Sequence, residues 1–292
     1  MNGLCVINKP SGMTSHDVVN RLRKITGEKS IGHLGTLDPL ATGVLPLLLG
    51  KFTRLAQYFS SAEKSYTGVI RFGFATDTWD AEGEPITPLT QPQLTLEVIC
   101  SAAQRFHGEI QQMPPPYSAK KIAGTPAYKL ARAGKPLELK AASIRIQAFE
   151  ILTLDVDQAT FSLSISAGGY VRSIAHELGQ ILGCGAHLAS LCRTQAGPFT
   201  LDEAHSLDEL TPLSGNLAAL RQLFVHPRNL LPALPAVTAD ALIIGRLRNG
   251  MQANLPEFST APLVKVFADQ RDLFAIAKRI AGTLFQPVVV MG

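Results

Sequence analysis

One glycine-rich stretch of this sequence carries a carboxylate in a setting where it could do chemistry. The stretch runs Gly32-His33-Leu34-Gly35-Thr36-Leu37-Asp38-Pro39-Leu40-Ala41-Thr42-Gly43, and it interrupts both the helical and the strand periodicities. This composition predicts a tight loop that holds Asp38 rigidly, where the carboxylate could act as a nucleophile. An Asp-Pro dipeptide is also typical of ordinary solvent-facing turns, so both interpretations stay open for the dipeptide alone.

Basic residues are concentrated in one later segment. Between Tyr117 and Arg145 the single acidic residue is Glu138, whereas seven residues are basic: Lys120, Lys121, Lys129, Arg132, Lys135, Lys140 and Arg145. Such a stripe can follow a phosphate backbone, although a solvated surface carries similar charges. The net charge of +4 alone says little about a nucleic-acid partner.

Two other sets of residues, four acidic residues and the cysteines, favour interpretations without a catalytic or metal-binding role. Asp77, Asp80, Glu82 and Glu84 are spaced closely enough to imitate the carboxylate pair of a glycoside hydrolase. Because they lie in an acidic, proline-containing segment, residues 75–92, we predict a solvated surface loop instead. The four cysteines form no C-x-x-C pair and no zinc-ligand spacing with a histidine, so we expect no metal site.

Local patterns predict the elements that position these residues. Thr14 with Asp17 resembles a capping box that begins a helix, and Gly27 is a plausible stop. Tyr66 is in phase with the apolar residues of a predicted strand. Further strands are expected over residues 3–8, 44–49, 143–149 and 160–166, and helices over residues 95–106 and 171–181. On the last helix, Arg172 lies off the apolar stripe, and His176 shares its face without an assigned role.

The composition of the chain shifts near residues 225–235, which are rich in proline and leucine. Beyond this segment we expect a helix over residues 239–248 and strands over 263–267, 273–277 and 285–291. The overall prediction is an α+β fold, with a mixed-sheet body over residues 1–230 and a small β-rich module over 231–292.

Composition also bounds the class of protein. Apolar residues make up 46% and charged residues 17%, as in folded globular proteins. The N-terminal residues show no basic region followed by a long apolar run, and the longest apolar stretch is too short to span a bilayer. We therefore expect a cytoplasmic protein without a membrane partner.

The whole string around Asp38 resembles the catalytic motif of the TruB family of pseudouridine synthases. Other segments agree with this family in the same order: Asn8-Lys9-Pro10, Lys64-x-Tyr66-x-Gly68, Met113-Pro-Pro-Pro-Tyr117-Ser118-Ala119-Lys120-Lys121, Gly169-Tyr170-Val171-Arg172-Ser173 and Leu191-x-Arg193. Together the matching segments cover about residues 1–200.

The resemblance implies a role for each matching residue. Asp38 is the catalytic carboxylate, Tyr66 stacks against the target base, and Arg172 pairs with Asp38. We expect this arginine to keep the pKa of the carboxyl low and to fix its direction. The implied substrate-binding residues are His33 for base flipping, Tyr170 and Leu191 in the uridine pocket, and Lys9 near it. The predicted contacts to the RNA backbone are Lys120, Lys121 and Arg132.

The resemblance also implies the reaction. We expect a uridine in the T-arm loop of tRNA, conventionally position 55, to become pseudouridine, with Asp38 as nucleophile on a flipped-out base. The C-terminal residues would form a PUA-like RNA-binding module. We expect a monomer that needs neither a cofactor, a metal nor a protein partner.

Two other functions remain as alternatives. A non-catalytic tRNA-binding or tRNA-folding factor could use the same surface, but the intact set of Asp38, Tyr66 and Arg172 favours the enzyme. A glycoside or nucleoside hydrolase would need a second carboxylate, which the motif lacks.

Overall fold

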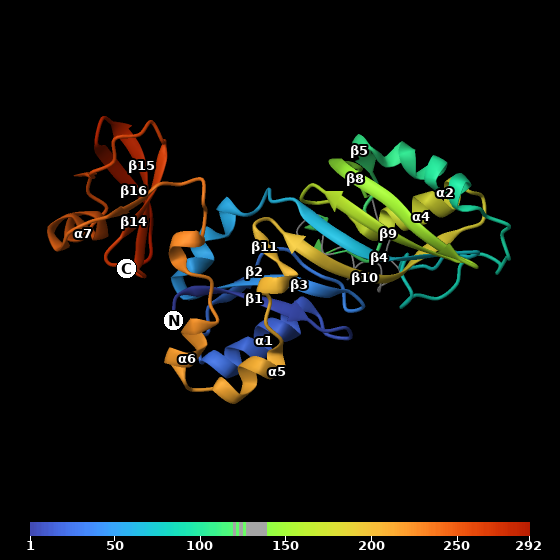
Figure 1. Cartoon of the computed structure of the whole chain (residues 1–292), viewed down its shortest axis with the longest axis horizontal. Coiled ribbons are helices and arrows are strands. Elements are labelled where there is room, and N and C mark those ends of the chain that lie inside the picture. Colours follow the sequence, from blue (N-terminus) through green and yellow to red (C-terminus); the bar gives the residue numbers. More distant parts are fainter. Residues whose placement is uncertain (119–120, 123–124, 127–138) are drawn as a thin grey trace.

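A nine-stranded sheet forms the body of the protein in the computed structural model, which describes residues 1–118, 121–122, 125–126 and 139–292 (Figure 1). The strand order is β1-β3-β10-β4-β9-β8-β5, with β2 on β3 and β11 on β10. The strands are β1 (Gly3–Lys9), β2 (Ile31–His33), β3 (Thr42–Leu49), β4 (Lys64–Phe72), β5 (Gly108–Gln112), β8 (Ala142–Asp155), β9 (Gln158–Ile165), β10 (Ala186–Ala196) and β11 (Phe199–Thr200). A separate hairpin pairs β6 (Lys121–Ile122) with β7 (Thr125–Pro126).

The sheet is antiparallel except where β10 meets β3. Those two strands are parallel and share only two register pairs, Cys192 with Thr42 and Arg193 with Gly43. On its other edge β10 pairs along most of its length with β4. The short parallel pairing brings the loop before β3 next to the middle of β4 and β10.

Helices cover the sheet in two groups (Figure 1). Helix α4 (Val171–Ile181) packs on β10, and α2 (Leu96–Ala103), which continues into the 3-10 turn η2 (Gln104–Phe106), packs on β8. Helix α1 (Ser15–Thr26) contacts β2 and α5 (Leu207–Leu210), and α6 (Leu217–Gln222) follows in the chain. A 3-10 helix, η1 (Gly50–Tyr58), lies between β3 and β4, and short turns η3 (Leu201–Glu203), η4 (Thr211–Leu213) and η5 (Pro227–Asn229) join the later elements.

Local sequence rules account for the main elements of the body. The capping box of Thr14 and Asp17 is confirmed at the start of α1, and Gly27 ends that helix in the left-handed conformation. The predicted alternation in β4 is also confirmed, because Tyr66, Ile70 and Phe72 are buried. These side chains join the core between the sheet and its helices.

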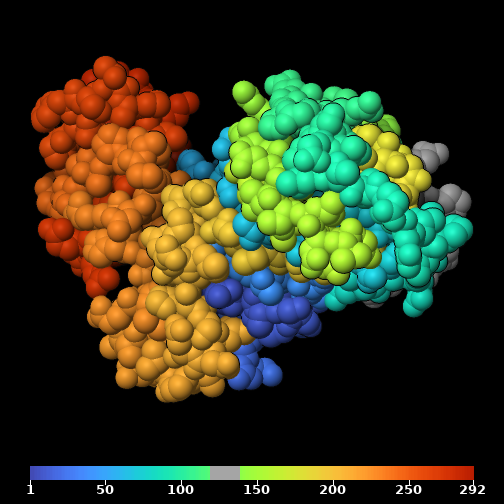
Figure 2. Space-filling model, turned by 45° about the vertical axis from the view of Figure 1, so that its right-hand side comes forward, coloured from blue at the N-terminus to red at the C-terminus, as the bar shows by residue number. Residues whose placement is uncertain are grey.

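The C-terminal module has a five-stranded sheet in the order β12-β14-β15-β16-β13. Its elements are β12 (Ala236–Thr238), α7 (Ala241–Arg248), β13 (Ala253–Asn254), β14 (Leu263–Phe267), β15 (Leu273–Ala281) and β16 (Leu284–Val290). The predicted β-rich character of this region is therefore confirmed. Figure 2 shows these residues gathered at one side of the molecule.

The module is packed against the body through a shared apolar cluster. Leu48 and Phe52 of the body belong to the same buried cluster as Phe267 and Ile276 of the module. The ammonium of Lys51 also donates a 2.7 Å hydrogen bond to the carbonyl of Gly292. The module therefore has a defined orientation relative to the body. In the part of the chain that the structure describes, no helix has the length and apolarity needed to cross a membrane.

Candidate active site

A cavity of about 330 Å³ opens where the loop before β3 meets β4 and β10. Its walls include Asp38, Tyr66, Tyr170, Arg172 and Leu191, which the sequence placed far apart. A larger hollow of about 590 Å³ lies between the body and the C-terminal module, and none of the predicted site residues lines it. The convergence of polar and aromatic side chains identifies the smaller cavity as the candidate active site.

Hydrogen bonds to the backbone on either side of Asp38, at Leu37 and Pro39, hold the loop that carries this residue. The hydroxyl of Ser15, at the start of α1, donates to the carbonyl of Leu37 at 3.1 Å and accepts from the Leu37 amide at 2.8 Å. The amide of Gly12 donates to the carbonyl of Pro39 at 2.9 Å. The segment from the end of β1 to the start of α1 therefore sets the position of the loop that carries Asp38.

Arg193 fixes the same loop from β10 and is fully buried. Its Nε donates to the carbonyl of Val44 at 2.7 Å, and its Nη2 donates to the carbonyl of Gly35 at 3.1 Å. Sequence reasoning assigned Arg193 no role. The only signal was its place in a matching motif, because its partners are backbone carbonyls of a distant loop.

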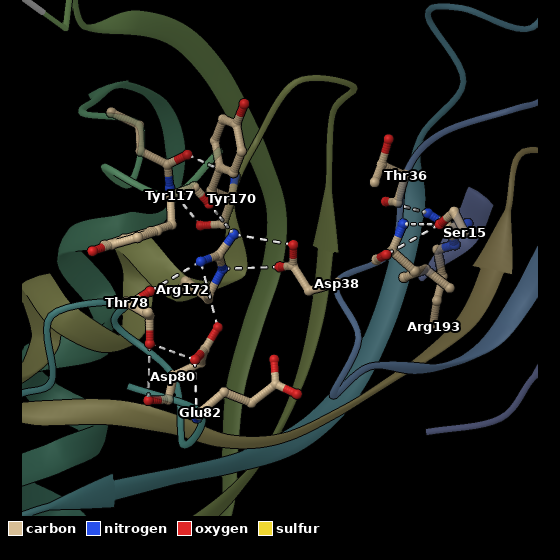
Figure 3. A network of polar contacts seen from close by, with 12 residues as sticks. Ser15, Thr36, Asp38, Thr78, Asp80, Glu82, Tyr117, Tyr170, Arg172 and Arg193 are labelled. Atoms are coloured by element: carbon tan, nitrogen blue, oxygen red, sulfur yellow. Dashed lines mark hydrogen bonds and ion pairs between the residues drawn. The ribbon is translucent and has the colours of Figure 1, made fainter. Parts of the chain in front are cut away.

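Arg172 contacts both carboxylate oxygens of Asp38. Its Nη2 donates to Oδ1 at 3.1 Å, and its Nε lies 2.9 Å from Oδ2. The side chain of Arg172 is only 4% exposed, whereas that of Asp38 is 34% exposed. The predicted pair is therefore present, with the arginine behind the carboxylate and the carboxylate facing the cavity (Figure 3).

The electrostatic balance at Asp38 differs from the prediction. Burial raises the pKa of Asp38 above its usual value and the nearby Asp80 carboxylate adds to this rise, whereas Arg172 and Lys9 act in the opposite direction. The expectation that the arginine would give a low pKa is therefore wrong in its net direction. The reason is that the loss of water around the carboxyl outweighs the attraction of the guanidinium.

The far side of Arg172 is held by the segment between β4 and α2. Its Nη1 donates to the carbonyl of Thr78 at 2.9 Å and lies 3.4 Å from Oδ2 of Asp80, while its Nη2 also donates to the carbonyl of Tyr117 at 2.9 Å. Asp80 accepts a 2.6 Å hydrogen bond from the Thr78 hydroxyl, and its side chain is 4% exposed. The prediction of a solvated acidic loop is wrong for Asp80, because Arg172 and Thr78 compensate its burial.

Aromatic and apolar side chains form the remaining walls. Tyr66 is 7% exposed, and burial raises its pKa. The backbone of Tyr170 is fixed by Gln112, which accepts from the Tyr170 amide at 2.7 Å and donates to its carbonyl at 3.0 Å. Leu191 is also buried, on β10. Two phenol rings and a leucine beside a carboxylate suit an unstacked base.

The structure places Lys9 and His33 outside the lining of the cavity. Lys9 is 0% exposed, and its ammonium donates to the carbonyls of Pro10 at 2.8 Å and Pro39 at 3.1 Å. Burial lowers its pKa to about 8. Both acceptors are backbone carbonyls, so Lys9 anchors the loop that carries Asp38, and its role in substrate binding stays a prediction. His33 ends β2, and burial lowers its pKa.

The predicted RNA-backbone residues cannot be placed against this cavity. Lys120 and Arg132 lie outside the described residues, and Lys121 is described only as part of the backbone of β6. Among the described residues, no group of three histidine, cysteine, aspartate or glutamate side chains gathers as metal ligands. Within those residues, the lining of the cavity includes a carboxylate, an arginine, the lysine Lys64 and two phenols.

Comparisons with known proteins agree with this geometry. Residues 23–171 match the model of the TruB family pseudouridylate synthase N-terminal domain, and residues 172–225 match that of the tRNA pseudouridylate synthase B C-terminal domain. The tRNA pseudouridine synthase B of Solibacter usitatus is 43% identical over 294 residues and covers 100% of both chains. That of Francisella tularensis (strain WY96-3418) is 45% identical over 215 residues, or 73% of this chain and 71% of its own.

Two solved structures have a similar fold. An H/ACA RNP bound to a substrate RNA containing 2′-deoxyuridine has a chain that matches with a TM-score of 0.70 at 23% identity, covering 99% of this chain and 85% of its own. A chain of a Cbf5–Nop10–Gar1 complex matches with a TM-score of 0.68 at 25% identity, covering 96% and 79%. The α+β fold with mixed sheets and a β-rich C-terminal module is thus shared with these proteins.

Proposed function

Because the chain belongs to the TruB family of pseudouridine synthases, isomerases that convert uridine in tRNA to pseudouridine, we propose that Asp38 is the nucleophile of this reaction. We further propose that its substrate is the T-arm loop of tRNA, at position 55. The observation that carries the proposal is the Asp38 carboxylate, which faces the cavity while Arg172 holds both of its oxygens.

The reaction exchanges one bond of the base for another. The glycosidic C–N bond breaks, the detached uracil turns, and its C5 carbon bonds to the same ribose carbon. The proton on C5 is lost to solvent, and the freed N1 takes up a proton. Asp38 forms a covalent bond to the sugar or to the base during this exchange and is released at the end. Atoms balance between substrate and product, so the reaction consumes no co-substrate.

The walls of the cavity support the handling of a flipped base. Tyr66 and Tyr170 offer flat rings against which an unstacked uracil can lie, at about 1–3 kcal/mol per stacked base. This contact offsets the few kcal/mol that unstacking costs. Leu191 covers the cavity from β10 and keeps water from the reacting carbon. His33, beside the catalytic loop, is proposed to assist extrusion.

A mapping experiment tests the proposal. Unmodified tRNA transcript and an isolated T-arm stem-loop should both gain one pseudouridine with the wild-type protein, whereas an anticodon stem-loop should gain none. Asp38→Ala should abolish product and leave tRNA binding within about threefold, because the carboxylate is not a phosphate contact. Asp157→Asn is the matched control, since it removes the carboxylate of another arginine pair, Arg71–Asp157 at 3.0 Å, outside the cavity.

The same experiment also distinguishes the enzyme from a protein that only binds tRNA. Wild-type protein that binds tRNA but forms no pseudouridine would favour a non-catalytic tRNA-binding or folding factor. Product formation by Asp38→Ala would refute the nucleophile. We also propose that the protein acts in the cytoplasm as a monomer without a protein partner. Residues 231–292 are proposed to form an RNA-binding module. Light scattering during gel filtration of the active protein tests the oligomeric state.

A further inference from the structure

The only tryptophan of the chain stacks on a histidine one helical turn beyond Arg172. The ring centroids of Trp79 and His176 are 4.3 Å apart, and the ring planes differ by 8°. His176 follows Arg172 by four positions on α4, so both side chains leave the same face of the helix. The stack therefore ties the segment between β4 and α2 to the helix that carries Arg172.

Trp79 stands between the two groups of this segment that contact Arg172. Thr78 precedes it and supplies the carbonyl at 2.9 Å, and Asp80 follows it and supplies the carboxylate at 3.4 Å. Figure 3 shows both groups facing the guanidinium on the side away from Asp38. The direction of the chain at residue 79 therefore decides whether these two contacts can form together.

The backbone of Trp79 is in a conformation that a bulky residue rarely adopts. Its φ is +64°, in the left-handed region. Neighbouring contacts hold it there, because the amide of Trp79 donates to the carbonyl of Thr76 at 3.2 Å and its carbonyl accepts from the amide of Leu188 at 3.0 Å. The unfavourable backbone persists only where surrounding contacts enforce it, and the stacked ring is one of them.

We propose that the Trp79–His176 stack positions Arg172, and through it the Asp38 carboxylate, for pseudouridine formation. Trp79 and His176 are positioning residues, since neither lines the cavity. This inference rests on the proposed role of Asp38. Loss of the stack lets Thr78 and Asp80 move relative to α4, and the guanidinium then loses its fixed direction behind the carboxylate.

The test compares variants that remove the stack with one that keeps a flat ring. His176→Ala and Trp79→Gly should each lower the single-turnover rate at saturating tRNA about tenfold, with the dissociation constant for tRNA unchanged. Trp79→Gly also tolerates the left-handed backbone, so it isolates the ring from the strain. His176→Phe should restore the rate to within about twofold, because phenylalanine can also stack.

Two further readouts distinguish positioning from general loosening. In His176→Ala the acid side of the pH–rate profile should move to higher pH, because a displaced Arg172 lowers the pKa of Asp38 less. The fluorescence of Trp79 should shift to longer wavelength and become easier to quench with acrylamide. Phe74→Leu is the control, since it removes another aromatic–histidine pair, Phe74 and His187 at 4.6 Å, that does not flank Arg172.

The outcomes are separable. A changed fluorescence with an unchanged rate and pH profile in His176→Ala would overturn the positioning role, as would an equal loss of rate in Phe74→Leu. If Trp79→Gly fails to fold, the comparison of His176→Ala with His176→Phe still tests the positioning role. Failure of the proposed function is a different result, because then Asp38→Ala would still form pseudouridine or the wild-type protein itself would form none.

Discussion

Arg172 and Asp80 should move the acid limb of the pH–rate profile in opposite directions. Asp38, the proposed nucleophile, must be ionised to react, so the rate should fall as the pH drops through its pKa. Burial and Asp80 raise this pKa, and Arg172 lowers it. Arg172→Gln therefore raises it further and should shift the acid limb to higher pH. Asp80→Asn removes a neighbouring negative charge and should shift the limb to lower pH.

Both variants should also slow the reaction, by amounts that follow from the hydrogen bonds and ion pairs that each substitution removes. Arg172→Gln removes two charged interactions with Asp38, at 2.9 and 3.1 Å. One is a hydrogen bond from Nη2 and the other an ion pair with Nε, and because about a third of the Asp38 side chain is exposed, each is taken at about 1.5 kcal/mol. Their sum predicts a decrease of about 100-fold in the rate. Asp80→Asn removes one ion pair at 3.4 Å, which predicts about tenfold.

The assay is the single-turnover rate of pseudouridine formation at saturating tRNA, measured from acid to neutral pH. Arg71→Gln is the matched control, because it removes an arginine–aspartate pair on the same sheet away from the cavity. Its profile should coincide with that of the wild type. If Arg172→Gln and Asp80→Asn shifted the acid limb in the same direction, or neither moved it, the electrostatic reasoning at Asp38 would be wrong.

The remaining predictions concern binding and stability. The double variant Lys120→Ala/Lys121→Ala should flatten the plot of log affinity for tRNA against log salt concentration by roughly 0.7–0.9 for each phosphate interaction removed. The control variant Lys24→Ala/Lys29→Ala, at two surface lysines, should leave the slope as it is. An unchanged slope in the Lys120/Lys121 variant would exclude phosphate contacts by these two lysines. Since the folded-state pKa of Lys9 is about 8 and its usual value is 10.5, the unfolded chain binds more protons between these values. Wild-type stability to urea should therefore rise with pH across that window by about 3 kcal/mol relative to Lys9→Met, and a constant difference would contradict the burial argument. Ser15→Ala leaves the buried amide of Leu37 without its partner and should lower the free energy of unfolding by about 1–3 kcal/mol, whereas Ser11→Ala at an exposed position should change it little.

Elements governed by neighbouring residues were predictable from sequence. The start of α1 depends on the side chains of Thr14 and Asp17, three positions apart, and its end depends on Gly27. The alternation in β4 follows from one buried face. The α7 and β14 elements of the C-terminal module lie within two residues of the predicted ranges for the same reason.

Features that depend on distant partners were not predictable from local pattern. Strand β10 lies in the middle of the sheet, but Arg193 and two register shifts against β4 disturb its alternation, so its residues indicated no strand. Asp80 belonged by composition to a solvated loop, and its burial depends on Arg172, far along the chain. Lys9 is buried for a similar reason, since its second acceptor is the carbonyl of Pro39.

The site shows why an arginine suits position 172 better than a lysine. One planar guanidinium contacts Asp38, Asp80 and two backbone carbonyls, those of Thr78 and Tyr117, and a single ammonium cannot direct donors along all of these lines. The contact to Tyr117 has a further consequence, because the chain continues from it to Lys120 and Lys121, the predicted RNA contacts. Asp38, the proposed nucleophile, and the segment predicted to hold the RNA backbone therefore both depend on one buried side chain, and we expect the geometry of Asp38 to be linked to the placement of the RNA.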